Sequence, residues 1–350
     1  MDHSTDQAQS TKHEGPETQA ASDVDWGMAT RSLVVGVFLT AALLIAAPAS
    51  AQRFAFERTY DVASSPVIDV STTRGKIAIR VGEPGRIVVT GAATVRVGLT
   101  TPGDAIDRAQ KIAANPPIEQ SRERLRLRSP ADPADNRAMT VNYDVRVPPD
   151  ARVVAVSDSG AIDVRDIGGA VEARTQSSAI ALSDLGGTAD VDTGSGAVTV
   201  DRVDGIVRIS TSSSAITARN LHGGLRARTS SGRVFGSFDG PGPVDVQTQS
   251  SAIDLTGVSG ALTTFSESGR TSITGDPSAA WNVSSGSSVI DVEFGSKVNL
   301  TLHATTGSGS VETRDQMVKG SIEKRRVEGA IGDGGPVVRL ASRSGSIQIR

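Results

Sequence analysis

The carboxylates best placed to do chemistry are Asp190, Asp192 and Asp201, which lie on adjacent short units of the chain and are expected to point outward. Two carboxyl groups on either side of a glycosidic bond can hydrolyse it, and their separation sets the stereochemistry. However, Arg174 and Arg208 are offset from these aspartates by one repeat, so surface ion pairs explain them equally well. The units also have almost no loops that could wall a groove. We therefore predict that the protein is not an enzyme, with a polysaccharide-active β-helix enzyme as a remote alternative.

Residues of the other catalytic and metal-binding types are scarce. The sequence has no Cys, which excludes a disulfide, a thiolate nucleophile and a thiolate metal site. Beyond the N-terminal segment the histidines are His222 and His303, and neither stands at a repeating offset that could activate a serine. Calcium-binding nonapeptide arrays need a recurring aspartate, whereas the equivalents of Asp163 are Ala181 and Thr199. We expect no catalytic, metal-binding or cofactor-binding residue, and no cofactor.

Binding is the remaining route to a function. The outward positions are mostly Ser, Thr, Asp and Arg, which suits weak, multivalent contact with envelope glycans or proteins. Aromatic residues are only 3% of the chain, and Phe235 and Trp281 are the candidates for a sugar-stacking platform. The alternative for Phe235, Phe238 and Phe265 is hydrophobic sealing where the repeat becomes irregular. Gly332–Gly335 lacks the Lys-Ser/Thr and the helix of a phosphate loop, and is predicted to be a turn.

An apolar run near the N-terminus indicates export. Leu33–Ala47 is shorter than the roughly 20 apolar residues that a membrane-spanning helix needs. The small residues Ala49 and Ala51 suit signal peptidase, which makes Gln52 the expected first residue of the mature protein. The alternative is an uncleaved membrane tether through residues 33–51. In both cases the rest of the chain is expected in the periplasm or at the cell surface.

The remaining boundaries follow from composition. Residues 1–27 are acidic, unlike the positive start of a signal peptide, and Met28 opens a suitable basic start. We therefore assign 1–27 to a disordered leader or a mis-assigned start and 28–51 to the signal peptide or anchor. The formal net charge is −3, with no Lys/Arg cluster and interleaved aromatics, so we expect no nucleic-acid partner. The exported part is divided into 52–150 and 151–350.

A repeat dominates the segment 151–350. A small residue recurs every nine positions, and the second and fourth residues after it are mostly aliphatic with polar residues between them. This two-residue alternation is typical of half-buried strands. The small residues are Gly160, Gly169, Ser178, Gly187, Gly196, Gly205, Ser214, Gly223 and Gly232, and the first aliphatic column includes Ile162, Val171, Ile180, Val198, Val207, Ile216, Leu225 and Val234.

Two longer periods are nested in this nine-residue unit. Apolar corners such as DIGG and DLGG alternate with polar corners such as TGSG and TSSS, which gives an 18-residue repeat. The polar corners alternate in turn between Ser-Gly and Ser-Ser, which gives 36 residues. The coil could therefore have 18 residues, with Ser178 over Gly160, or 36, with Ser178 over Ser214. The strict alternation favours 36.

Stacked copies of such a unit form a β-solenoid. A five-residue strand cannot bury its apolar face alone, whereas stacking closes the aliphatic columns into one continuous core. We predict that Ile180 and Ile216 both point into this core. The column that contains Thr175, Thr193 and Thr211 is predicted to form a hydroxyl ladder on the surface. The alternative architecture is an antiparallel sandwich, which the regularity of the columns disfavours.

Less regular elements flank the array. Arg74–Arg80 resembles an early rung, and strands are expected at 124–128 and 139–147 around the loop SPADPADN. A helix over about 103–115 is predicted to cap the open end of the stack, since an uncovered end invites edge pairing. After the array the rung pattern returns in Ser287–Val292, Ser308–Thr313 and Ser344–Ile349.

These features resemble a known family. The alternating SGxI and SSAI rungs, the strand VNYDVRVPPDARV and the closing GAIGDGGPVVRLASRSGSIQIR are similar to the bacterial "putative adhesin" domain of unknown function, over roughly Phe54–Arg350. The resemblance implies an exported or membrane-tethered β-solenoid without established enzyme activity. We therefore expect a non-enzymatic, adhesin-like envelope or surface module whose partner is an envelope glycan or protein. The alternative is an envelope-stress sensing or regulatory partner protein.

Overall fold

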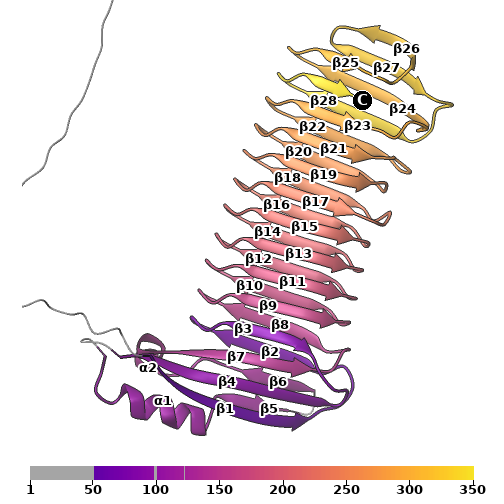
Figure 1. The fold of residues 1–350 in the computed structure, drawn as a ribbon. Coiled ribbons are helices and arrows are strands. Elements are labelled where there is room, and N and C mark those ends of the chain that lie inside the picture. Colours follow the sequence, from indigo (N-terminus) through magenta and orange to yellow (C-terminus); the bar gives the residue numbers. More distant parts are fainter. Residues whose placement is uncertain (1–50, 98–100, 122) are drawn as a thin grey trace, which may run out of the picture. The chain divides into compact units, whose positions relative to one another are not determined.

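The computed structural model describes residues 51–97, 101–121 and 123–350 (Figure 1). Contacts divide the chain into two units, Met1–Ala47 and Pro48–Arg350, and the described residues belong to the second. The leader predicted at 1–27 and all but the last residue of the segment predicted at 28–51 lie outside the described residues. Within the described part of the chain, no helix has the length and apolar character needed to cross a bilayer.

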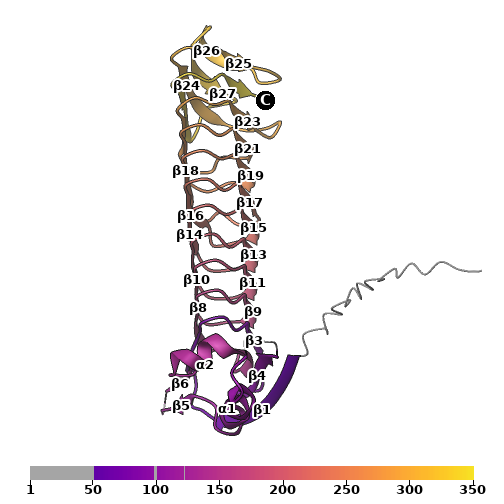
Figure 2. The same ribbon diagram turned by 90° about the vertical axis from the view of Figure 1, so that its left-hand side faces the viewer.

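Two large sheets face each other across the core, and their strands are mostly parallel (Figures 1 and 2). We call them sheet A and sheet B. In the described residues, sheet A has 14 strands. In spatial order they are β1 (Ala51–Asp61), β4 (Arg86–Arg96), β7 (Met139–Val147), β3 (Ile77–Val81), β9 (Ile162–Ile167), β11 (Ile180–Leu185), β13 (Val198–Val203), β15 (Ile216–Leu221), β17 (Val234–Phe238), β19 (Ile253–Val258), β21 (Thr271–Gly275), β23 (Ile290–Glu293), β29 (Ile347–Ile349) and β25 (Val311–Thr313).

Sheet B runs in the opposite order along the stack and has 15 strands in the described residues. They are β26 (Val318–Glu323), β27 (Arg326–Ile331), β24 (Leu300–Thr306), β28 (Val337–Ser342), β22 (Trp281–Ser285), β20 (Leu262–Ser266), β18 (Val244–Thr248), β16 (Leu225–Thr229), β14 (Val207–Thr211), β12 (Ala189–Thr193), β10 (Val171–Thr175), β8 (Arg152–Ser157), β2 (Val67–Thr72), β6 (Arg124–Leu127) and β5 (Ile118–Gln120). The fold is the predicted all-β solenoid.

Each coil of the array consists of one strand from each sheet. Ile180 of β11 pairs in parallel with Val198 of β13, one 18-residue repeat later, and Val171 of β10 pairs likewise with Ala189 of β12. The coil therefore has 18 residues, and the expectation of 36 was wrong. The Ser-Gly and Ser-Ser corners stack directly on each other. A Cβ at Gly196 would lie 1.6 Å from the carbonyl oxygen of Ser178, so the alternating glycine reflects close backbone approach.

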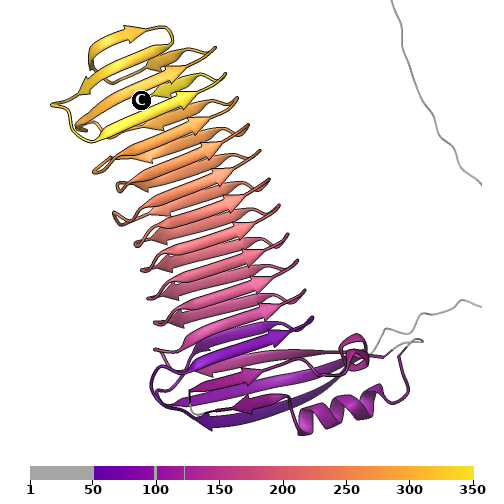
Figure 3. The same cartoon turned by 180° about the vertical axis from the view of Figure 1, so that it is seen from behind.

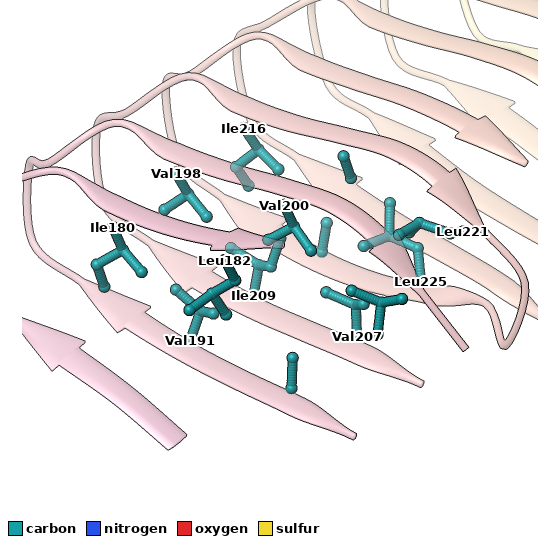
Figure 4. Packing of buried hydrophobic residues seen from close by; sticks show 14 of the residues in the cluster. Ile180, Leu182, Val191, Val198, Val200, Val207, Ile209, Ile216, Leu221 and Leu225 are labelled. Carbon is teal, nitrogen blue, oxygen red and sulfur yellow. The ribbon is translucent and has the colours of Figure 1, made fainter. Parts of the chain in front are cut away.

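The aliphatic columns form one core, as the sequence predicts. Ile180 and Ile216 are each 1% exposed, and they project into the space between the sheets together with Val191 and Ile209 from the opposite side (Figure 4). Burial of one such side chain contributes about 1.5–3 kcal/mol. Because every coil repeats the same positions, the core is continuous along the array. The apolar corner residues also belong to it: Ile167, Leu185, Val203 and Leu221.

Sheet A carries a regular backbone irregularity that the sequence analysis missed. Asp184 has a φ of 58° and lies between Ser183 and Leu185, which both pair with the next coil while Asp184 does not. Asp and Asn tolerate this left-handed conformation better than most residues, because their short side chains can hydrogen-bond locally. The bulge turns the following corner residue back into the core. The same position has a positive φ at Asp166, Arg202, Asn220 and Gly257.

The threonine column lies inside the stack, so the predicted surface ladder was wrong. Thr193 is 2% exposed, and its Oγ1 accepts a hydrogen bond from the N–H of Gly196 at 3.1 Å. Ser157 accepts from the N–H of Gly160 in the same way at 2.8 Å. The inward hydroxyl thus satisfies a backbone donor of the polar corner, a common local role of Ser and Thr.

The N-terminal end of the stack is covered as predicted. Helix α1 (Ala105–Ala114) contacts β1 and β4, and its residues Ala105, Ala109 and Ala113 are buried in the core. Figure 2 shows α1 beside β1 and β5 at this end. The expected strands at 124–128 and 139–147 are β6 and β7. The loop SPADPADN contains a second short helix, α2 (Pro133–Ala138), whose first turn is capped by Asp132 through the N–H of Ala134 at 2.7 Å.

At both ends the order of coils in space differs from their order in sequence. The early rung β2–β3 lies between the later β6–β7 and β8–β9. The last rung, β28–β29, lies between β22–β23 and β24–β25. The C-terminus is accordingly marked within the stack, with further strands beyond it (Figure 3). The three expected late rungs are confirmed as β23, β25 and β29, while their spatial order was not predicted.

Arg350 anchors this inserted final rung. Its guanidinium and that of Arg270 both contact the carboxylate of Asp291, which is 5% exposed, and Arg270 does so at 2.8 Å. Burial raises the pKa of Asp291, but the hydrogen bonds from the two arginines lower it further, so the net pKa lies below its usual value. The final strand is therefore held by a buried ion pair as well as by its ladder.

Candidate functional site

The three aspartates considered for catalysis are not brought together. Asp190 and Asp192 are on β12 in sheet B, whereas Asp201 is on β13 in sheet A, so the core separates them. Asp190 lies 3.5 Å from Arg208, as expected for a surface ion pair. Asp201 accepts a hydrogen bond from the Nδ2 of Asn220 at 2.8 Å and contacts a neighbouring arginine.

Both histidines lie at the surface beside one carboxylate. His222 Nδ1 is 3.7 Å from Asp239, and His303 Nδ1 is 3.5 Å from Glu328. The hydrogen bond from Arg326, together with that from His303, lowers the pKa of Glu328. Among the residues that the structure describes, no three His, Cys, Asp or Glu side chains gather as a metal site would require.

The glycine-rich segment 332–335 is a turn, as predicted. Gly332 and Gly334 have φ values of 65° and 81°, which favour glycine. The N–H of Asp333 donates to Asn299 Oδ1 at 2.9 Å, so the turn is held against the strand β24 that follows Asn299. This segment joins β27 to β28 and serves to bring the last coil back into the stack.

Trp281 cannot provide a sugar platform, which corrects that prediction. Its side chain is fully buried, its Nε1 donates to the carbonyl of Gly260 at 2.9 Å, and its ring centre lies 5.8 Å from that of Phe294. Trp281 occupies the first inward position of β22, next to Leu262 of β20. Phe238 is also buried, which confirms sealing of the core for that residue.

Phe235 is half-buried on the outer face of sheet A. The guanidinium of Arg219 lies 5.6 Å from its ring centre, so a cation–π contact already covers part of that ring. Beside it is a shallow hollow of about 480 Å³ that includes Thr217, Arg233 and Asp254. Phe235 therefore has a partner within the protein.

Phe265 is the exposed aromatic residue that sequence reasoning assigned to sealing, and that assignment was wrong. Its side chain is 40% exposed on the outer face of sheet B. It lies beside Gln247 of β18, and Gln247 lies beside Arg228 of β16 in the parallel register. The signal was present in LTTFS, where Phe265 stands between two inward residues, Thr264 and Ser266.

A groove with a volume of about 540 Å³ runs along sheet B at the polar corners, from β12 to β20. We call it the corner groove. Its length follows from the coil spacing: five neighbouring strands about 4.8 Å apart span about 19 Å. Its lining is Asp192, Thr193, Gly194, Ser210, Thr211, Ser212, Arg228, Thr229, Ser230, Gln247, Thr248, Gln249 and Phe265.

Polar contacts orient the side chains next to the Phe265 ring. Gln247 Nε2 donates to Asp245 Oδ1 at 3.1 Å, and Arg228 Nη2 lies 4.0 Å from Asp245. Arg228 Nε also approaches Gln247 Oε1 at 3.5 Å. The groove therefore combines an exposed aromatic ring with positioned amide, guanidinium and hydroxyl groups. Such a combination can stack on the apolar face of a sugar and hydrogen-bond its hydroxyls.

Comparison with known proteins adds little to this description. No protein-family model and no curated protein matches the sequence. A solved structure to which the chain is similar is that of a protein described as a putative cell adhesion protein from Clostridium sporogenes. The two sequences are 12% identical, and the alignment covers 84% of this chain and 98% of that chain with a TM-score of 0.17. A score this low carries no argument, so the resemblance to the adhesin-like domain stays a prediction.

Proposed function

We propose that the protein is a non-enzymatic, exported module of the cell envelope or surface that binds an envelope glycan in the corner groove. The observation that carries the proposal is Phe265, an exposed ring at one end of a groove whose other side chains are polar. Export is supported by the apolar run at 33–47 and the small residues that follow it. The adhesin-like role rests on this binding and on the sequence resemblance.

The shape of the groove suits a chain rather than a single small molecule. Because equivalent residues recur along the stack, successive sugar units can meet similar hydroxyl and amide groups. Contacts of this kind are individually weak and gain strength when several act together. A polymer is therefore the expected ligand.

The test is binding of the full chain to a panel of envelope polysaccharides, followed by Phe265→Ala. We expect the substitution to weaken glycan binding about threefold to tenfold, comparable with the ~0.5–1.5 kcal/mol of an aromatic stacking contact. Phe235→Ala is the matched control, because it removes an aromatic ring from the opposite sheet. Equal losses in both variants, or no binding to any glycan, would contradict the proposal.

The same panel separates binding from catalysis. We expect no polysaccharide in it to be depolymerised by the chain. Cleavage that disappears when Asp190→Asn and Asp192→Asn are combined would instead support the enzymatic alternative, since both residues lie on the outer face of β12.

A further inference from the structure

A second cleft, with a volume of about 700 Å³, lies at the N-terminal end of the stack. Four arginines reach it from four separate segments: Arg74 between β2 and β3, Arg96 at the end of β4, Arg108 on α1 and Arg137 on α2. The inserted segment between β3 and β8 supplies all of them except Arg74. The remaining lining residues are Thr94, Thr101, Pro102, Ala134, Ala138, Met139, Thr140 and Ser159. The lining therefore contains no carboxylate.

Only one of these four arginines is neutralised by carboxylates. Arg108 lies 3.3 Å from Asp104 and 3.0 Å from Asp135. Arg74 donates to the carbonyl of Asn136 at 2.6 Å, which fixes its guanidinium without cancelling its charge. Within the part of the chain that the structure describes, Arg74, Arg96 and Arg137 have no carboxylate at ion-pair distance.

The arginines of the regular array differ from these. Arg165 lies 2.8 Å from Asp163, Arg208 lies 3.5 Å from Asp190, and Arg233 lies 2.8 Å from Asp254. A concave surface lined with charges of one sign concentrates counter-ions of the opposite sign. The cleft is thus a site where positive charge is left for an external partner.

Hydroxyl groups complete the cleft. Thr94 of β4 and Thr140 of β7 are paired across neighbouring strands and both line it. Ser159 lines it from the first polar corner of the array. Guanidinium groups bind phosphate oxygens through paired hydrogen bonds, and hydroxyls can donate to the remaining oxygens.

We propose that this cleft binds a ligand that carries two or more phosphate groups. Three uncompensated arginines from different segments match several negative charges better than one, and the volume exceeds what a single phosphate needs. The ligand can be a soluble phosphate-containing polymer or the headgroups of anionic lipids, since both present the same chemistry. The proposal does not depend on glycan binding in the corner groove.

Titration calorimetry of the full chain with inorganic tripolyphosphate tests the site. We expect binding that weakens as salt is added, and about tenfold weaker binding in Arg96→Gln and in Arg137→Gln, both exposed residues. Arg339→Gln on β28 is the matched control, because it removes the same charge from an exposed position at the far end of sheet B. No binding of tripolyphosphate, or an equal loss in Arg339→Gln, would overturn the proposal.

Three further arms identify the chemistry and its source. Binding of long-chain polyphosphate but not of phosphatidylglycerol vesicles indicates a soluble polymer, and the reverse indicates lipid headgroups. Equal affinity for polygalacturonate would overturn the assignment to phosphate, because that polymer carries only carboxylates. Phe265→Ala should leave tripolyphosphate binding unchanged, so failure of this proposal and failure of the glycan proposal are distinguishable.

Discussion

Gly196→Ala tests the 18-residue coil directly. The added Cβ would lie 1.6 Å from the carbonyl oxygen and 2.3 Å from the carbonyl carbon of Ser178. Both obstructing atoms are backbone, and the corner that holds them is tied to the next coil by hydrogen bonds such as Ser195 N–H to Gln176 O at 3.1 Å. Overpacking costs about 1–3 kcal/mol where side chains can yield. Because a backbone must move here and break inter-coil hydrogen bonds, we expect the upper value, about 3 kcal/mol.

The matched control is Ser178→Ala at the equivalent corner of the preceding coil. Its Cβ is already accommodated, and the change removes a surface hydrogen bond to the carbonyl of Ser159 at 2.7 Å, worth about 0.5–1 kcal/mol. Urea unfolding, compared at equal slope, measures both variants. In a 36-residue coil Gly196 would stack on Gly160 and Gly232, and an alanine would be tolerated. Equal and small costs in the two variants would therefore refute the register.

Three other substitutions address stability. Thr229→Val should be neutral or stabilising by about 1 kcal/mol in urea unfolding, because the Thr229 hydroxyl is buried without a hydrogen-bond partner in the described structure, whereas Thr193→Val should destabilise by about 1 kcal/mol because it orphans a corner N–H. Asp291→Asn should destabilise by about 2 kcal/mol near neutral pH. Since the pKa of Asp291 is lowered in the folded state, this contribution is present above the unfolded pKa of about 3.9 and lost below it, so the variant and the wild type should converge in acid denaturation experiments. Trp281→Ala should cost about 3–5 kcal/mol, and a cost below 1 kcal/mol would contradict its burial.

The core of the array could be predicted because two signals agree there. Alternation fixes which residues of a strand point inward, and the repeat places Ile180 and Val198 at equivalent positions of successive coils. The same alternation also places Thr193 inside, two positions after Val191. The error over the threonine column came from treating a polar residue as a surface residue, although a hydroxyl can be buried when it accepts a corner N–H.

The aromatic residues were harder because the period fails around them. Paired residues are 18 positions apart from Val244 to Leu262 but 19 apart from Leu225 to Val244 and from Leu262 to Trp281. A fixed count therefore loses the frame, and the true inward position of Trp281 is visible only in the register. Phe265 falls on the outward position of the same irregular coils.

The order of the terminal coils could not be predicted from the sequence. Rungs such as β23, β25 and β29 have the same alternating pattern, and any of them could pair with any other. The observed order depends on connections, because β29 can enter between β23 and β25 only after the hairpin β26–β27 has returned the chain to the stack. The buried Asp291 with its two arginines then distinguishes this arrangement from a simple continuation.

Both proposed binding sites lie where the strict repeat is interrupted, and there is a physical reason for this. In the regular coils an outward carboxylate meets an arginine on its own strand or the next, as Asp163 meets Arg165 and Asp190 meets Arg208. These pairs satisfy the surface and leave few groups for a ligand. The extra residues after Leu225 permit an outward Phe265, and the insertion between β3 and β8 brings unpaired arginines together. The regular array therefore acts as the support, and recognition is expected at its irregular coils and at its N-terminal end.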